Sequence, residues 1–84
     1  MGYKVKWSTR AEQELDRETP NDDQKRALED AMRRVEATLA RDPRAVGVMK
    51  LVSTRLLTDP PLGVIYDIIE DDKLVVIASA WLIQ

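Results

Sequence analysis

Hydrophobic positions are densest between Leu62 and Trp81, in the segment LGVIYDIIEDDKLVVIASAW. Two runs rich in valine, isoleucine and leucine, Leu62–Ile69 and Lys73–Trp81, flank three acidic residues at positions 70–72. β-Branched residues pack well on a pleated surface and a short polar connector lets the chain reverse, so the pattern predicts a β-hairpin. Apolar residues occupy both faces of the two runs, which is typical of strands at the centre of a sheet.

Apolar and charged residues alternate from Tyr3 to Trp7, which predicts a first strand whose odd-numbered side chains are buried. Thr9 and Glu12 have the spacing of a capping box, so we expect a short helix from there to about Glu18. The apolar stripe of this helix is thin, and packing against the rest of the fold must therefore hold it in place.

The most periodic segment follows Asn21, a residue type that caps the start of helices. Apolar residues then recur at i, i+4, i+7 and i+11, a spacing that places them on one helical face. The residue before a proline avoids the helical region, so this second helix should end near Asp42, ahead of Pro43. Its apolar face consists of Leu28, Met32, Val35 and Leu39.

A further strand is expected from Val48 to about Leu57, and a loop with two prolines at 58–61 leads into the hairpin. The predicted order is β-α-α-β-β-β, an α+β fold of a single domain spanning residues 1–84. We expect an antiparallel sheet with the helix pair packed on one face and the first strand joining from the side. The other face of the hairpin is also apolar and needs a cover, from the chain's own end, a second copy or a partner.

Composition narrows the chemistry that this fold can carry. The chain has 84 residues, with 13 basic and 15 acidic side chains, so it lacks the basic surface of a non-specific nucleic-acid binder. Cysteine and histidine are both absent, which excludes thiol nucleophiles, Ser-His-Asp catalysis and the common zinc sites, and no cofactor or metal site is predicted. No apolar run approaches the ~20 residues of a membrane span and no signal peptide is recognisable, so we expect a cytoplasmic protein with no membrane partner.

Several local motifs follow one another in a characteristic order. YKVKW leads directly into a capped helix, the long helix closes as LARDP, and Gly47-x-x-Lys50-Leu51 is followed by Arg55 and by VIYDIIEDDKLVVIASA. These motifs cover nearly the whole chain and resemble the RelE/ParE superfamily of small toxins from bacterial type II toxin–antitoxin systems. The resemblance implies the fold described above, inhibition of growth, and an antitoxin protein that neutralises it.

Members of the ribonuclease branch of this superfamily cut ribosome-bound mRNA without a metal, using basic residues to stabilise developing charge and often a tyrosine for proton transfer. The resemblance implies that Lys50, Arg55 and Tyr66 would fill these roles. Where the family commonly has an arginine before the strand tyrosine this chain has Gly63, and its residues from Trp81 onward include no basic group. The branch that inhibits DNA gyrase needs a protein-binding surface instead, which suits this composition better.

Each catalytic candidate also has a structural interpretation. Tyr66 lies within an apolar hairpin, where a tyrosine is usually a core residue with a hydrogen-bonded hydroxyl. Arg55 could pair with Asp59 or Asp67, and Lys50 could be an ordinary solvated side chain. The sequence alone therefore leaves open whether the chain is an enzyme.

Trp81, Leu82 and Ile83 are the candidates for partner binding, because exposed apolar residues are costly and tryptophan is enriched at interface hot spots. They either fold onto the sheet or form an interface. The resemblance implies a toxin that acts on translation, by mRNA cleavage at the ribosome, or on DNA gyrase. The alternatives are a catalytically inactive protein-binding module with the same fold, or a homodimer without a further partner.

Overall fold

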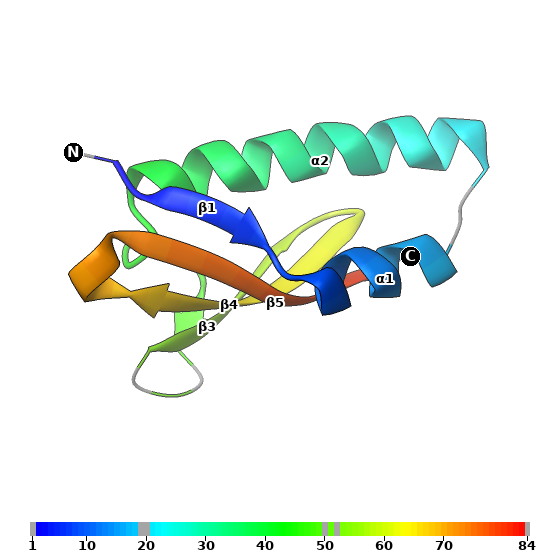
Figure 1. The fold of residues 1–84 in the computed structure, drawn as a ribbon. Helices are drawn as coiled ribbons and strands as arrows, with labels where there is room; N and C mark the ends of the chain where they lie inside the picture. Colours follow the sequence, from blue (N-terminus) through cyan, green and yellow to red (C-terminus); the bar gives the residue numbers. More distant parts are fainter. Residues whose placement is uncertain (1, 19–20, 50, 52, 84) are drawn as a thin grey trace.

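The structure is a computed structural model that describes residues 2–18, 21–49, 51 and 53–83. It confirms the predicted α+β class, and Figure 1 traces the order of helices and strands. In chain order the elements are β1 (Lys4–Trp7), α1 (Thr9–Arg17), α2 (Asp22–Arg41), β2 (Val48–Met49), β3 (Thr54–Asp59), β4 (Leu62–Ile69), the short 3-10 helix η1 (Glu70–Asp72) and β5 (Leu74–Leu82).

The five strands form one sheet in the order β1-β5-β4-β3-β2. β4 pairs with β3 and β5, and β5 pairs with β4 and β1, so the predicted hairpin does lie at the centre. The pairs β2–β3, β3–β4 and β4–β5 are antiparallel. β1 joins at the edge parallel to β5, so the sheet is mixed and not wholly antiparallel as predicted. Parallel neighbours need a long connection, which the helices and the intervening strands provide.

The prediction of a single strand from Val48 to about Leu57 is wrong, because the structure divides this segment into β2 and β3. The two strands pair antiparallel, with Val48 opposite Leu56. Between them the Leu51 amide donates to the Thr54 carbonyl at 3.1 Å and closes a reverse turn. Serine and threonine at this point favour a turn over a continuous strand. The apolar residues at 48, 49 and 51 therefore lie on a short hairpin at the sheet edge.

Side-chain caps begin both helices. At α1 the Ser8 hydroxyl accepts from the Ala11 amide at 3.0 Å, so the cap lies one residue before the predicted Thr9. At α2 the Asn21 side chain accepts from the Gln24 amide at 2.9 Å, which confirms the predicted start of this helix. In the described part of the chain, no helix is both long and apolar enough to cross a membrane.

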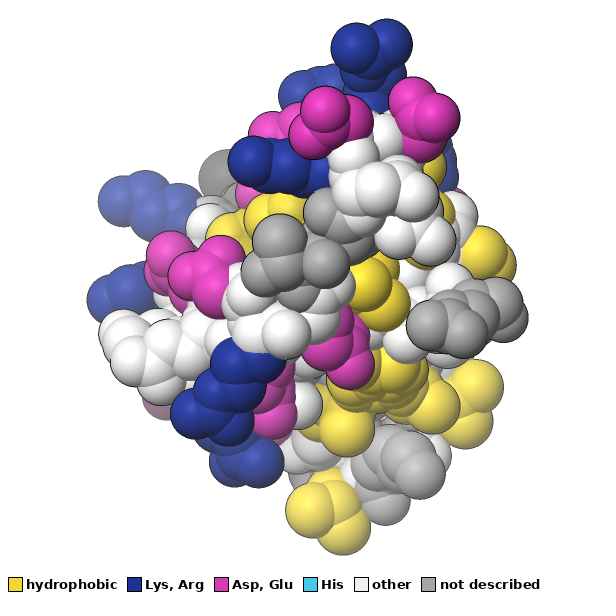
Figure 2. Space-filling model, turned by 90° about the vertical axis from the view of Figure 1, so that its right-hand side faces the viewer, with side chains coloured by type: hydrophobic (Ala, Val, Ile, Leu, Met, Phe, Trp, Pro, Cys, Tyr) yellow, Lys and Arg dark blue, Asp and Glu magenta, His cyan; other side chains and the backbone are white. Residues whose placement is uncertain are grey.

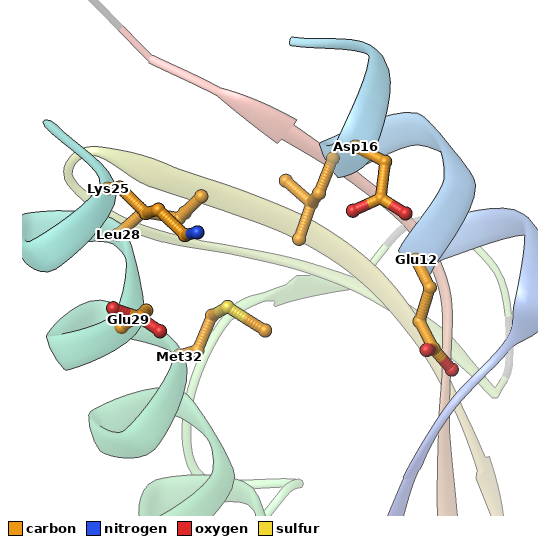
Figure 3. Close-up of a pocket in the computed structure, with 7 residues that line it drawn as sticks. Glu12, Asp16, Lys25, Leu28, Glu29 and Met32 are labelled. Atoms are coloured by element: carbon orange, nitrogen blue, oxygen red, sulfur yellow. The ribbon is translucent and has the colours of Figure 1, made fainter. Parts of the chain in front are cut away.

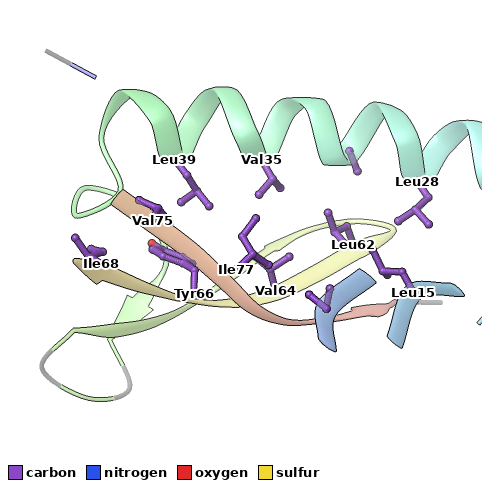
Figure 4. Close-up of a cluster of buried hydrophobic side chains, with 13 residues drawn as sticks. Leu15, Leu28, Val35, Leu39, Leu62, Val64, Tyr66, Ile68, Val75 and Ile77 are labelled. Carbon is purple, nitrogen blue, oxygen red and sulfur yellow. The ribbon is translucent and has the colours of Figure 1, made fainter. Parts of the chain in front are cut away.

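The core lies between α2 and the face of the sheet that α2 covers (Figure 1). In Figure 4 the buried side chains of α2 point toward the strands, and alternate residues of β4 point back toward the helix. These two directions follow from the 3.6-residue period of a helix and the two-residue period of a strand. The buried apolar residues are Ala11 and Leu15 of α1, Leu28, Ala31, Val35 and Leu39 of α2, Leu62, Val64, Tyr66 and Ile68 of β4, and Val75, Ile77 and Ala80 of β5.

Beyond the end of β1, helix α1 lies along the same edge of β5. The Glu14 carboxylate accepts from the Ser79 hydroxyl at 2.8 Å and from the Ala80 amide at 3.2 Å, and these bonds lower the pKa of Glu14. One helical turn later, the Glu18 carboxylate accepts from the Leu82 amide at 2.6 Å. The two carboxylates thus bind edge amides that a neighbouring strand would otherwise pair with.

The Glu70 carboxylate fastens the start of β1 to the turn between β4 and β5. It accepts hydrogen bonds from the Lys73 ammonium at 2.6 Å, the Tyr3 hydroxyl at 2.7 Å and the Arg44 guanidinium at 2.9 Å. These three donors, with Lys73 contributing most, lower the pKa of Glu70 to about 2. The residue before β1, the loop after α2 and the turn at η1 therefore meet at one acidic side chain.

Candidate functional site

Two of the three catalytic candidates from the sequence, Arg55 and Tyr66, lie at the junction of β3, β4 and the loop between α2 and β2. Lys50 lies outside the described residues. Arg55 of β3 and Tyr66 of β4 are direct partners in the antiparallel register, so the structure brings these two together. Both side chains contact the carbonyl groups of the preceding loop.

Tyr66 is completely buried, and its hydroxyl donates toward the Pro43 carbonyl at 2.7 Å, with the Val46 carbonyl at 3.0 Å. Burial raises the pKa of Tyr66, and the nearby charge of Arg55 offsets part of this rise. The hydroxyl therefore stays protonated at neutral pH and serves as a donor to the loop. Tyr66 is therefore a core residue with a hydrogen-bonded hydroxyl, as its structural interpretation predicted. A role of this hydroxyl in proton transfer stays a prediction.

Arg55 is half-buried, and its side chain binds the same loop from the neighbouring strand. Its Nε donates to the Val46 carbonyl at 2.9 Å and one Nη donates to the Gly47 carbonyl at 3.3 Å. Among the described residues, no ion pair joins Arg55 to Asp59 or Asp67, the two partners of its structural interpretation: Asp59 pairs with Arg34 at 3.0 Å, and Asp67 accepts from the Thr54 hydroxyl. A guanidinium has five N–H donors, so Arg55 retains donors that a ligand could use.

Gly47 allows the loop to approach Tyr66 this closely. It adopts a φ of 76°, and a Cβ placed on it would lie 2.8 Å from the Leu56 carbonyl oxygen and 2.9 Å from the Tyr66 hydroxyl. Other residues rarely adopt such a φ, and a side chain here would collide with both strands. The glycine that contributed to the family resemblance is thus required by the contact between loop and sheet.

Trp81 explains why a glycine occupies position 63. The two residues are opposite each other on β5 and β4, and a Cβ added to Gly63 would lie only 2.5 Å from the Trp81 ring. The ring therefore fills the space that the arginine common in the family would need at position 63. Trp81 itself is half-buried, so it folds onto the sheet while part of its surface stays accessible.

Leu82 and Ile83, the other candidates for partner binding, are also half-buried. Leu82 packs against the hydrophobic core, and the Ile83 amide donates to the Pro61 carbonyl at 2.7 Å. The segment is held against the sheet by its own backbone, and its role in partner binding stays a prediction.

Sequence reasoning missed two surface features. Val48, Met49 and Leu51 are 66%, 62% and 70% exposed on the β2–β3 hairpin, because the segment folds back instead of forming one half-buried strand. A groove between α1 and α2 was also missed, since its walls come from two separate periodic segments whose packing no local pattern reveals. In the described part of the chain, Asp and Glu side chains form no group of three or more that could hold a metal ion.

Comparison with known proteins identifies the fold. The structure is similar to the crystal structure of the RelBE2 toxin–antitoxin complex from Mycobacterium tuberculosis, with a TM-score of 0.77. The match covers 98% of this chain and 92% of the chain in that complex, at 24% sequence identity. No protein-family model and no curated protein sequence matches the chain. The predicted RelE/ParE-like fold is confirmed.

We expect Gly63→Ala to lower the free energy of unfolding by about 1–3 kcal/mol, because the added methyl group overlaps the Trp81 ring. The same change should cost less in a Trp81→Ala background, where the ring is absent. Equilibrium unfolding in urea of the four proteins measures both costs. Equal costs in the two backgrounds would contradict the close contact between these residues.

Tyr66→Phe should lower the free energy of unfolding by about 1–3 kcal/mol, because the buried Pro43 carbonyl loses its donor. Tyr3→Phe is a matched control, since it removes a hydroxyl that is only half-buried and should cost less. Urea unfolding compares the two variants. An effect of Tyr66→Phe no larger than that of the control would mean that this hydroxyl does not hold the loop.

Proposed function

We propose that this chain, which has the fold of the RelE/ParE toxins, is the growth-inhibiting member of a type II toxin–antitoxin pair in the bacterial cytoplasm. The similarity to a chain of the RelBE2 toxin–antitoxin complex over 98% of the sequence supports this proposal. The partner in this proposal is an antitoxin protein, part of which folds onto the toxin and neutralises it. Coupled folding of this kind lets a short segment cover a large apolar surface.

The target we favour is a protein such as DNA gyrase, to which the toxin would bind without cutting RNA. The observation that carries this choice is the Tyr66 hydroxyl, which is buried and engaged with the Pro43 carbonyl. Cleavage of RNA by this fold would need cations fixed around the scissile phosphate and an accessible proton donor. Arg55 is partly occupied by the loop, and the Trp81 ring fills the place of a further arginine at position 63.

Cleavage of mRNA at the ribosome is the second candidate, with Lys50, Arg55 and Tyr66 as its catalytic residues. It is favoured by the pairing of Arg55 with Tyr66 across two strands and by the N–H donors that Arg55 retains. The third candidate is a catalytically inactive binding module or a homodimer, which the exposed apolar side chains of Val48 and Met49 favour.

We expect induction of this chain alone to arrest growth of a bacterial host, and Lys50→Ala/Arg55→Ala to arrest growth equally at the same level of folded protein. A protein target is recognised by a surface and does not depend on two cations, whereas a ribonuclease loses transition-state stabilisation with them. Growth curves with quantified soluble protein provide the measurement.

Arg55→Lys is the control for folding, because it keeps the charge at this position while the bonds to the Val46 and Gly47 carbonyls are altered. Circular dichroism of each purified variant establishes that it is folded. Loss of arrest in a folded double variant would contradict a protein target and favour mRNA cleavage. Absence of arrest by the parent chain would favour the inactive binding module.

A further inference from the structure

A groove between α1 and α2 takes no part in the target binding or the catalysis considered above (Figure 3). Its volume is about 280 Å³, just below the roughly 300–1,000 Å³ of pockets that enclose a small molecule. The lining includes the buried Leu15 and Leu28 and the half-buried Met32, so its floor is apolar. The groove is therefore sized for a few side chains of a partner, not for a whole metabolite.

The rim of the groove is acidic. Glu12 and Asp16 of α1 stand on one wall, and Glu29 and Lys25 of α2 stand on the other (Figure 3). Three carboxylates and one ammonium give the rim a net charge of −2. All four side chains are exposed. Figure 2 views the end of the molecule where α1 finishes and α2 starts, and apolar side chains reach the surface there beside charged ones. A complementary ligand carries positive charge next to an apolar face.

The spacing of these residues fits a helical ligand. Glu12 and Asp16 are one helical turn apart on α1, and Leu28 and Met32 are one turn apart on α2. Residues at this separation lie roughly 5–6 Å apart along a helix surface. An amphipathic helix repeats its own apolar and charged residues at the same interval, so it can match both walls at once.

We propose that the α1–α2 groove binds a basic amphipathic helix of a partner protein, with apolar side chains on the Leu28–Met32 floor and lysine or arginine against the acidic rim. That this partner is the antitoxin rests on the proposed function. The preference of the groove for a basic helix rests on its own lining and charge.

The probe is a fluorescein-labelled peptide of about 14 residues, the length of an ordinary helix, with leucine at i, i+4, i+7 and i+11 and lysine at the flanking positions. A second peptide has glutamate in place of every lysine. We expect the lysine peptide to bind the full chain at least about tenfold more tightly in a fluorescence anisotropy titration at low salt. Equal affinities, or no binding of the lysine peptide up to about 1 mM, would overturn the proposal.

Two charge reversals locate the binding site. Glu12→Lys/Glu29→Lys reverses two carboxylates of the groove and should weaken binding of the lysine peptide by about tenfold or more. Asp71→Lys/Asp72→Lys makes the same change in net charge on η1, at the opposite end of the molecule (Figure 1), and should alter binding by less than about twofold. Equal losses of peptide affinity in the two variants would mean that binding depends on overall charge, and would overturn the assignment of binding to the groove.

Methyl NMR reports where on the unmodified protein the peptide binds, without any change of charge. The Met32 methyl group lines the groove, whereas Met49 is 62% exposed on β2 and is the internal control. The lysine peptide should shift the Met32 signal and leave Met49 unchanged; a shift of Met49 alone would overturn the proposal. Self-association of the chain that disappears in Glu12→Lys/Glu29→Lys would assign the groove to a second copy and also overturn it.

These outcomes are independent of the growth assay. Growth arrest without selective binding of the lysine peptide would support the proposed function and contradict the proposal that the groove binds a basic helix. Selective binding by a chain that does not arrest growth would support helix binding by the groove and contradict the proposed toxin function.

Discussion

The pairing of β4 with β5 is the constraint on which the other elements depend. β3 is held by β4, β1 is held by β5, and α1 lies along the remaining edge of β5 with two of its carboxylates on backbone amides. Both strands also direct alternate residues into the core beneath α2 (Figure 4). Each large aliphatic side chain buried there contributes about 1.5–3 kcal/mol relative to exposure. A slip of β4 by one residue would turn Tyr66 away from the loop and Gly63 away from Trp81.

The same register determines what the catalytic candidates can do. Arg55 and Tyr66 are cross-strand partners, and both bind carbonyl groups of the loop between α2 and β2. Trp81 covers Gly63 on the neighbouring strand pair. Arg55 and Tyr66, which the family resemblance associates with phosphate chemistry, therefore contribute to packing, while apolar and acidic surface stays accessible around the helices and the β2–β3 hairpin. This distribution supports the proposal that the chain recognises a protein and does not cleave RNA.

The sequence predicted those features that follow from local periodicity. Alternation identified the inner face of β1, whose side chains are half-buried and not fully buried as predicted; the 3.6-residue period identified α2, and the two apolar runs identified the central hairpin. The division of β2 from β3 was missed, because the turn at Leu51–Thr54 depends on pairing and not on an evident glycine or proline signal. The partners of Arg55, the overlap of Trp81 with Gly63 and the α1–α2 groove join residues distant in the chain, and no local pattern encodes them.

The central proposal is that this chain inhibits growth by binding a protein, while Arg55 and Tyr66 serve the packing of the loop. The most direct test maps the 5′ ends of ribosome-bound mRNA in cells whose growth this chain has arrested. We expect the pattern of ends to match that of uninduced cells, because Tyr66 is buried and Arg55 is engaged with the loop. New ends that accumulate at the ribosomal decoding site soon after induction would contradict the claim and assign the chain to the ribonucleases.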